Sequence, residues 1–343
     1  MAIWQPQDLK VRLFGVDGIE KGSFGRAGEG PGEFRSVGAH GWVGDSLWIL
    51  DGKLHRTSVF TARGVLVRDG IWLNVLTLPS PSYLKFSGGP IGAAPGAILP
   101  DGSFVPMSGV HLPERNGADG TIGVSARESI VRVGPDGVLR KVLLTTPPLG
   151  RPPACFREWE SGTISGSIGA PFCASPIKAF SPDGSTILVL QQANAQGAKG
   201  SFNLLLLSTR GDTLLRREIP YSPEKIAASA LEAEFAKSTP RGMRLAQMPR
   251  AYLDAKKQLP RIIYYPPVRR ILLGRDEATW IELDGASPSH RWLVLNARSG
   301  AVIGVLQLPP NITLRAVSRD TVWASELDED DVPSVVRLKI LGP

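Results

Sequence analysis

One four-residue turn occurs three times in this chain, and it constrains the fold more than any other feature. The pattern x-Pro-Asp-Gly stands at residues 99–102, 134–137 and 181–184. Proline presets the backbone angle φ, aspartate bonds the local backbone, and glycine supplies the positive φ that a tight hairpin needs. Each turn therefore predicts two antiparallel strands.

The strands around these turns follow one repeated pattern. A strand with Trp or a similar apolar residue, often with Asp, precedes a turn, a second strand, a glycine-centred turn and a third strand. About five copies are visible, and the 38 glycines and 29 prolines suit many short strands joined by turns. Copies with unequal insertions predict a repeat architecture. They lie at residues 44–68, 96–144 and 180–219, and later as ATWIELD and DTVWASELD with the strands that follow them.

Several segments resemble six-bladed β-propeller proteins related to NHL-repeat and TolB-like propellers. They are FGRAGEGPGEF at residues 24–34, the strand GDSLWILD, the stretch ILLGRDEATWIEL and the ending TVWASELDEDDVPSVVRLKIL. The resemblance covers nearly the whole chain and implies a single all-β propeller domain over residues 1–343. The family is mostly bacterial and uncharacterised, and its members are commonly exported or lipid-anchored. It implies a periplasmic or extracellular location, but no reaction and no cofactor.

The first predicted blade is incomplete. Residues 9–24 predict the outer two strands of a blade, without an inner pair before them, and the last copy predicts three strands. The chain thus shows about five blades plus half a blade. We expect that it starts late relative to the family and so lacks an export signal. No apolar run approaches the roughly 20 residues that span a bilayer, and no secretory signal is visible.

The glycine-rich segment at residues 24–34 could be mistaken for a binding loop. It lacks the GK[ST] ending of a phosphate-binding loop, and no helix is expected after it. We interpret it as a crossing between blades, in which glycines permit the sharp path, Glu33 pairs locally and Phe34 packs between sheets.

A helical insertion interrupts the strands between the third and fourth visible blades. The sequence Ser-Pro-Glu at residues 222–224 predicts a helix start, and Ala227, Leu231 and Phe235 then share one face. A second helix is expected around residues 249–259.

Basic residues concentrate in and beside this insertion, about residues 222–260. Residues 237–275 hold ten Lys or Arg and one acid, Asp254, so their net charge is +9, against +7 for the whole chain. This face is either a solvated surface or a docking site for a protein, an acidic polysaccharide or phospholipid headgroups. Nucleic acid is not expected, since no recognised module is present. The candidate binding residues are Arg241, Arg244, Arg250, Lys256 and Lys257.

Two further sets of residues are candidates for function or stability. His40 is expected on an inner strand near the central channel, where propellers bind ligands, although a lone histidine is more often structural. Cys155 and Cys173 bracket a Gly- and Ser-rich loop and are either a disulfide or two unrelated buried residues. No metal site is expected, and the acidic run at residues 326–331 suits a solvated hairpin end.

These features favour a monomeric ligand- or protein-binding module of the cell envelope rather than an enzyme. No Ser-His-Asp set or HExxH motif is recognisable. The alternative is a calcium-dependent lactonase or esterase, because propellers include such hydrolases. Their sites need carboxylates on several inner strands, and the predicted inner strands here carry few.

Overall fold

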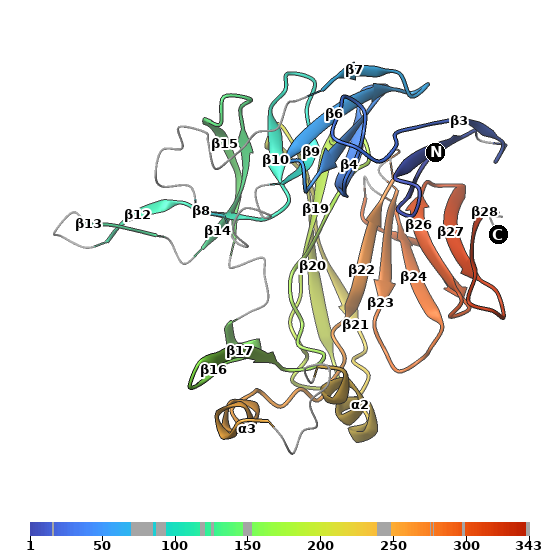
Figure 1. The fold of residues 1–343 in the computed structure, drawn as a ribbon. Helices are drawn as coiled ribbons and strands as arrows, with labels where there is room; N and C mark the ends of the chain where they lie inside the picture. The colour runs from blue at the N-terminus through green and yellow to red at the C-terminus, as the bar shows by residue number, and fades with distance from the viewer. Residues whose placement is uncertain are drawn as a thin grey trace. The chain divides into compact units, whose positions relative to one another are not determined.

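The chain folds almost entirely into antiparallel strands. The computed structural model describes residues 1–15, 17–69, 85–86, 94–116, 121–124, 127–146, 153–238, 248–274, 276, 278–296 and 299–340. Within them the only α-helices are α2 (Ala228–Ser238) and α3 (Arg250–Lys257), and Figure 1 shows sheets of mostly long, twisted strands. The predicted fold class, an all-β propeller of the six-bladed type with a small helical part, is confirmed.

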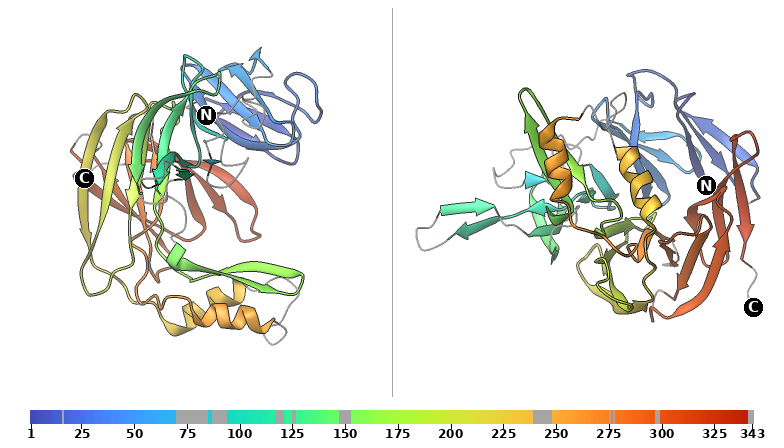
Figure 2. Two further views of the ribbon diagram at one scale, coloured as in Figure 1. Left: turned by 90° about the vertical axis from the view of Figure 1, so that its left-hand side faces the viewer. Right: turned by 90° about the horizontal axis from the view of Figure 1, so that it is seen from below.

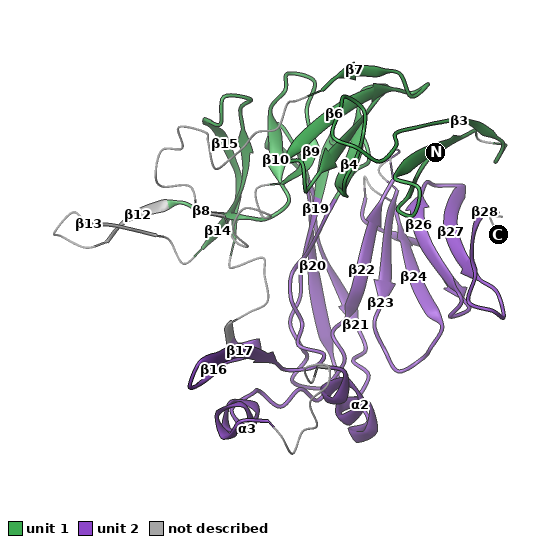
Figure 3. Ribbon diagram, viewed as in Figure 1, with its two compact units in different colours: residues 1–147, 180–187, 207–213 green, residues 148–179, 188–206, 214–343 purple. Residues whose placement is uncertain are grey.

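The chain divides into two compact units, which Figure 3 shows in different colours. Unit 1 comprises residues 1–147, 180–187 and 207–213, and unit 2 the remainder. The sheets that begin in unit 1 are β1 (Ala2–Gln5), β2 (Lys10–Phe14) and β3 (Glu20–Phe24); β4 (Val37–Val43), β5 (Ser46–Asp51), β6 (Arg56–Thr61) and β7 (Leu66–Arg68); and β9 (Pro95–Ile98), β10 (Phe104–Pro106), β14 (Glu128–Val133) and β15 (Leu139–Thr146). The last sheet also contains β8 (Lys85–Phe86) and β11 (Val110–His111). A separate hairpin of β12 (Pro113–Asn116) and β13 (Thr121–Val124) is inserted in the sequence between β11 and β14.

The remaining sheets lie wholly or mainly in unit 2. They are β18 (Ile177–Phe180), β19 (Thr186–Gln191), β20 (Gly200–Ser208) and β21 (Thr213–Tyr221), part of which falls in unit 1; β22 (Val268–Leu273), β23 (Thr279–Leu283), β24 (His290–Leu295) and β25 (Val302–Leu308); and β26 (Ile312–Val317), β27 (Thr321–Leu327) and β28 (Pro333–Lys339). Trp280 and Trp292 are fully buried between the last two of these sheets, with ring centroids 6.5 Å apart. A separate hairpin, β16 (Phe156–Ser161) and β17 (Ile164–Gly169), follows the short helix η1 (Pro153–Cys155).

The three Pro-Asp-Gly turns have the predicted geometry. In each, the glycine N–H donates to the carbonyl three residues earlier at 2.9 Å, and the aspartate Oδ1 accepts the N–H two residues later at 3.0 to 3.2 Å. The glycines have positive φ, so a side chain would be strained there. The φ values of Gly102, Gly137 and Gly184 are 79°, 76° and 68°.

The segment at residues 24–34 is the predicted crossing. Phe34 is 0% exposed and packs with Phe60 in the core between β2 and β6. Glu33 accepts hydrogen bonds from Arg26 at 2.6 Å and from the Gly30 N–H at 2.8 Å. Arg56 holds the backbone of the segment, because it donates to the carbonyls of Glu29, Gly30 and Glu33 at 2.8, 2.9 and 2.6 Å.

The two ends of the chain form three-stranded sheets. The predicted three strands of the last copy are β26, β27 and β28, and the acidic run forms the turn between the last two. At the other end, β1 pairs with β2 over Ala2 to Gln5. This strand was not predicted, because its four residues carry too little periodicity.

The predicted start of the first helix is wrong. Helix α2 begins at Ala228, six residues after Ser222. The Glu224 carbonyl instead accepts the Tyr265 N–H at 3.0 Å, and its side chain accepts the Ala286 N–H at 3.2 Å. Tertiary hydrogen bonds therefore hold Glu224 out of the helix. The second helix lies where it was expected, and neither helix, with 11 and 8 residues, has the length to cross a bilayer.

Candidate functional site

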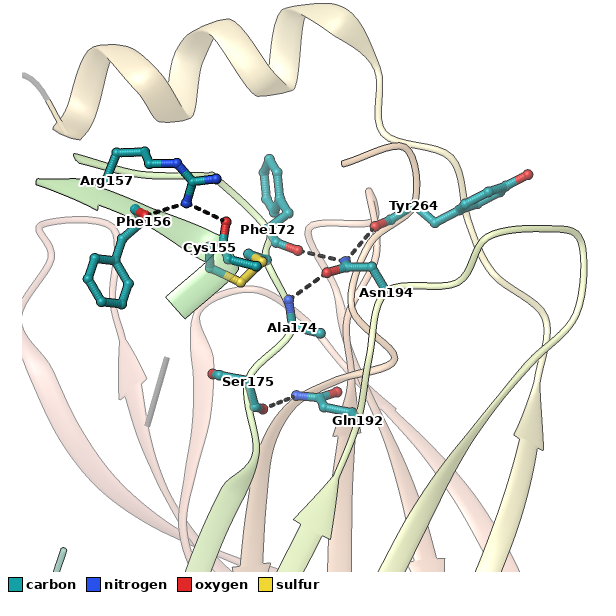
Figure 4. Close-up of a disulfide and its surroundings, with 11 residues drawn as sticks. Cys155, Phe156, Arg157, Phe172, Ala174, Ser175, Gln192, Asn194 and Tyr264 are labelled. Carbon is teal, nitrogen blue, oxygen red and sulfur yellow. Dashed lines mark hydrogen bonds between the residues drawn. A yellow bond between two sulfur atoms is a disulfide. The ribbon is translucent and has the colours of Figure 1, made fainter. Parts of the chain in front are cut away.

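The candidate site is built on a disulfide-closed loop in unit 2. Cys155 and Cys173 are joined by a disulfide at the base of the β16–β17 hairpin (Figure 4). Asn194 then links this loop to the chain after α3, because it accepts the Ala174 N–H at 2.7 Å and donates to the Tyr264 carbonyl at 3.0 Å. The loop and the segment that follows α3 therefore have fixed positions relative to each other.

The hairpin packs against α3. Trp159 on β16 meets Tyr252 on α3 edge to face, with ring centroids 5.8 Å apart. Ile168, Met248 and Ala255 are buried in the same cluster, at 3%, 6% and 6% exposure. In both views of Figure 2 the green hairpin and the orange helix lie side by side. Phe235 of α2 packs against this cluster as well.

A groove of about 460 Å³ lies between the two helices and the segment after α3. We call it the cationic groove. Its apolar lining comes from α2, α3, the stretch at residues 259–262 and the loop near the disulfide. The lining residues are Leu231, Phe235, Leu253, Leu259, Pro260, Ile262 and Pro171, with Lys256, Lys257 and Arg261.

The three cations differ in how they are held. The Lys256 ammonium lies 4.3 Å from the centre of the Phe235 ring, which fixes it over the apolar lining. Lys257 pairs with Asp254 at 3.3 Å, and its side chain is 78% exposed. Arg261 is exposed on the segment after α3. The groove thus combines apolar walls with a net positive rim, which suits an anionic group attached to an apolar one.

The structure separates the basic residues into different classes. Arg241 and Arg244 lie outside the described residues. Arg250 is on α3 with a 94% exposed side chain, pairs with Asp254 at 3.7 Å and does not line the groove. Among the candidates, Lys256 and Lys257 are thus the two that line it.

Two arginines that contribute to the sequence charge are neutralised in the neighbouring sheet. Arg269 donates to Asp284 at 2.8 and 3.0 Å, and Arg270 donates to the buried Glu282 at 3.0 Å. His290 also contacts Glu282, with Nδ1 at 2.6 Å from Oε1. This cluster joins strands of one sheet and adds no free positive charge to the surface.

His40 lies on β4, the first strand of its sheet, in unit 1. Desolvation by the surrounding protein lowers the pKa of its imidazole, although the residue keeps solvent contact. Its predicted role in binding stays a prediction.

Metal-ligating residues do not gather in the part of the chain that the structure describes. No group of three or more His, Cys, Asp or Glu has the geometry to hold an ion there. The calcium-dependent hydrolase stays a prediction. It would be established by stoichiometric calcium together with lactone or ester hydrolysis that is lost on chelation.

Comparisons with known proteins assign no family to this chain. No protein-family profile and no curated protein matches the chain. Among solved structures, it is similar to a member of the DUF4221 family from Bacteroides vulgatus, with 11% identity, a TM-score of 0.46 and coverage of 96% of this chain and 86% of the other. It is also similar to AztD from Citrobacter koseri, with 11% identity, a TM-score of 0.33 and coverage of 98% and 80%. Likeness at this level carries no information on function.

Proposed function

We propose that this propeller is a binding module of the cell envelope that holds an anionic amphiphile in the cationic groove. The observation that carries the proposal is the combination of an apolar lining with Lys256, Lys257 and Arg261 at one place. The anionic head would pair with the rim, and the apolar part would cover the leucines and Phe235.

The size of the groove favours a small molecule over a protein surface. A volume of about 460 Å³ falls within the range of roughly 300 to 1,000 Å³ that is usual for small-molecule pockets. Each methylene buried against such walls contributes about 0.8 kcal/mol. A ligand with a single acyl chain therefore gains affinity with chain length until the groove is filled.

Two observations support a location in the cell envelope. The Cys155–Cys173 disulfide suits an oxidising compartment, and the propellers that the sequence resembles are commonly exported. Cell fractionation tests the location, and recovery of the natural protein in the cytoplasm with both thiols reduced would contradict it.

Dodecanoate is a suitable probe, because dodecyltrimethylammonium has the same chain with the opposite charge. Isothermal titration calorimetry below the micellar concentration should show binding of dodecanoate and much weaker binding of the cation. Hexanoate should bind more weakly than dodecanoate, since fewer methylenes are buried.

Charge reversal within α3 gives a matched control. Lys257→Glu should weaken dodecanoate binding about tenfold, because this cation lines the groove. Arg250→Glu changes the same charge on the same helix outside the groove and should leave the affinity within about twofold. Equal effects of these changes, or equal binding of the cationic probe, would refute the proposal.

A further inference from the structure

A second pocket in unit 2 lies apart from the cationic groove. It has a volume of about 450 Å³ and is bounded by the end of β21, the stretch at residues 265–267, and strands β24 and β25. Its walls are largely apolar, with Leu283, Leu293 and Val305 on one side and Phe202 on the other. We call it the Asp284 pocket, because its polar end contains that carboxylate.

The carboxylate of Asp284 is largely buried, and one of its two oxygens has no hydrogen-bond donor among the described residues. Its side chain is 10% exposed. Oδ1 accepts two hydrogen bonds from Arg269, at 3.0 and 2.8 Å, and one from the Gly285 N–H at 3.0 Å. Oδ2 accepts none from any residue that the structure describes. A carboxylate oxygen at the wall of a pocket without a donor is an acceptor for a ligand.

The corresponding aspartate of another blade shows that the fold does not require this free oxygen. Asp51 ends the second strand of its sheet, as Asp284 follows the second strand of its own. The Oδ2 of Asp51 accepts the N–H groups of Arg35 and Ser36 at 2.6 and 3.2 Å, and its Oδ1 accepts two more at 2.9 Å. In Asp284, which lines the pocket, Oδ1 is used for structure and Oδ2 has no donor among the described residues.

A second carboxylate lies at the same end of the pocket. Glu224 Oε1 accepts the Ala286 N–H at 3.2 Å, and Oε2 has no hydrogen bond to a described residue. A side chain at position 285 would place its Cβ 2.5 Å from this Oε2, so Gly285 leaves the space that the carboxylate occupies. Burial, and after it the charges of Asp284 and Glu224, raise the pKa of the Tyr265 phenol, which agrees with two carboxylates acting on one point.

We infer that the Asp284 pocket binds a small molecule that carries a protonated amine on an apolar body. The ammonium donates to Asp284 Oδ2 and Glu224 Oε2, beside the Tyr265 ring, and the apolar body covers Leu293 and Val305. Ammonium groups suit this end because they only donate, and carboxylates only accept. Arg291 also lines the pocket. Because of its positive charge, tighter binding of an anion than of the amine is the competing outcome.

Three probes of one shape test the inference. Isothermal titration calorimetry should show binding of 2-phenylethylamine, with 2-phenylethanol and 3-phenylpropanoate at least about tenfold weaker. Tighter binding of the anion would show that Arg291 dominates and would overturn the inference. Equal binding of the amine and the alcohol, or no binding of the amine, would also overturn it.

Variants locate the binding. Glu224→Gln should weaken the amine about tenfold, and Val305→Trp should abolish binding by filling the pocket. Ile303→Trp is the control, because that residue lies on the same strand and has a similar exposure (54%, against 62% for Val305), but does not line the pocket. Asp284→Asn should weaken binding at least as much, with the circular dichroism spectrum checking that the loss of the Arg269 partner has not unfolded the sheet. Lys257→Glu should have no effect on the amine, so failure here is distinguishable from failure of the cationic groove.

Discussion

Trp159 and Tyr252 meet edge to face across the junction between the β16–β17 hairpin and α3, with ring centroids 5.8 Å apart. The hairpin is a separate two-stranded sheet, and such a hairpin is marginal by itself. Its stability therefore depends on this contact and on the disulfide at its base.

Removal of the Trp159 ring should loosen the hairpin without unfolding the propeller. Trp159→Ala loses the aromatic contact and its buried area, which together contribute about 2 kcal/mol. Hydrogen exchange should become faster in β16 and β17 and stay unchanged in β19 and β20. Ile164→Ala, a change at a 51% exposed residue of β17, is the control, and an equal acceleration by it would contradict the role of the ring.

The disulfide should stabilise the protein through the unfolded chain. It joins residues 18 positions apart, and closure of such a loop contributes about 3 kcal/mol in the chain-entropy model. Replacement of both cysteines by alanine should lower the free energy of unfolding by this amount in urea titrations. The native protein should gain mass on alkylation only after reduction, and alkylation before reduction would contradict the pairing.

Asp51 should be among the most sensitive polar positions of unit 1. It is 1% exposed and accepts four backbone N–H groups. Asp51→Ala leaves these donors unsatisfied and should lower the free energy of unfolding by more than about 2 kcal/mol. The exposed Asp45 in the preceding turn is a matched control, and Asp45→Ala should cost less than about 0.5 kcal/mol. Similar losses for the two variants would show that the four bonds contribute little.

Asp284 should give a measurable pH dependence of stability. Burial raises the pKa of its carboxyl above the ordinary 3.8, because desolvation outweighs the hydrogen bonds from Arg269. The folded state therefore binds the proton more tightly than the unfolded state, and this contribution to stability is lost as the pH rises from 3.8 through the raised pKa. The free energy of unfolding of Asp284→Asn, relative to that of the wild type, should therefore increase as the pH rises from about 4 to about 7 in urea titrations. A constant difference across this range would contradict the raised pKa.

The sequence predicted the strands well because their signals are local. The geometry of the Pro-Asp-Gly turns depends only on neighbouring residues, since the aspartate accepts a hydrogen bond from the N–H two residues later. The roles of Glu33 and Phe34 were also predicted correctly, because the segment lacks a phosphate-binding ending and was therefore interpreted as a crossing between two strands. Local chemistry thus determined most of the fold.

The candidate site was only partly predictable, because its geometry depends on residues distant in sequence. Lys256 and Lys257 were recognised by charge, but their groove also needs Pro171, far along the chain. The charge count also included Arg269 and Arg270, whose partners lie 15 and 12 residues away on the adjacent strand or just after it. Periodicity and composition contain no signal for such pairs.

Arg56 has a consequence for how the crossing at residues 24–34 can vary among related proteins. One guanidinium holds three carbonyls of that segment, so the bonds depend on the spacing of residues along the chain and not on which side chains they carry. Substitutions at the outward positions leave this spacing intact, whereas inserting or deleting one residue between Glu29 and Glu33 moves at least one carbonyl out of reach. The segment should therefore tolerate changes of composition and conserve its length.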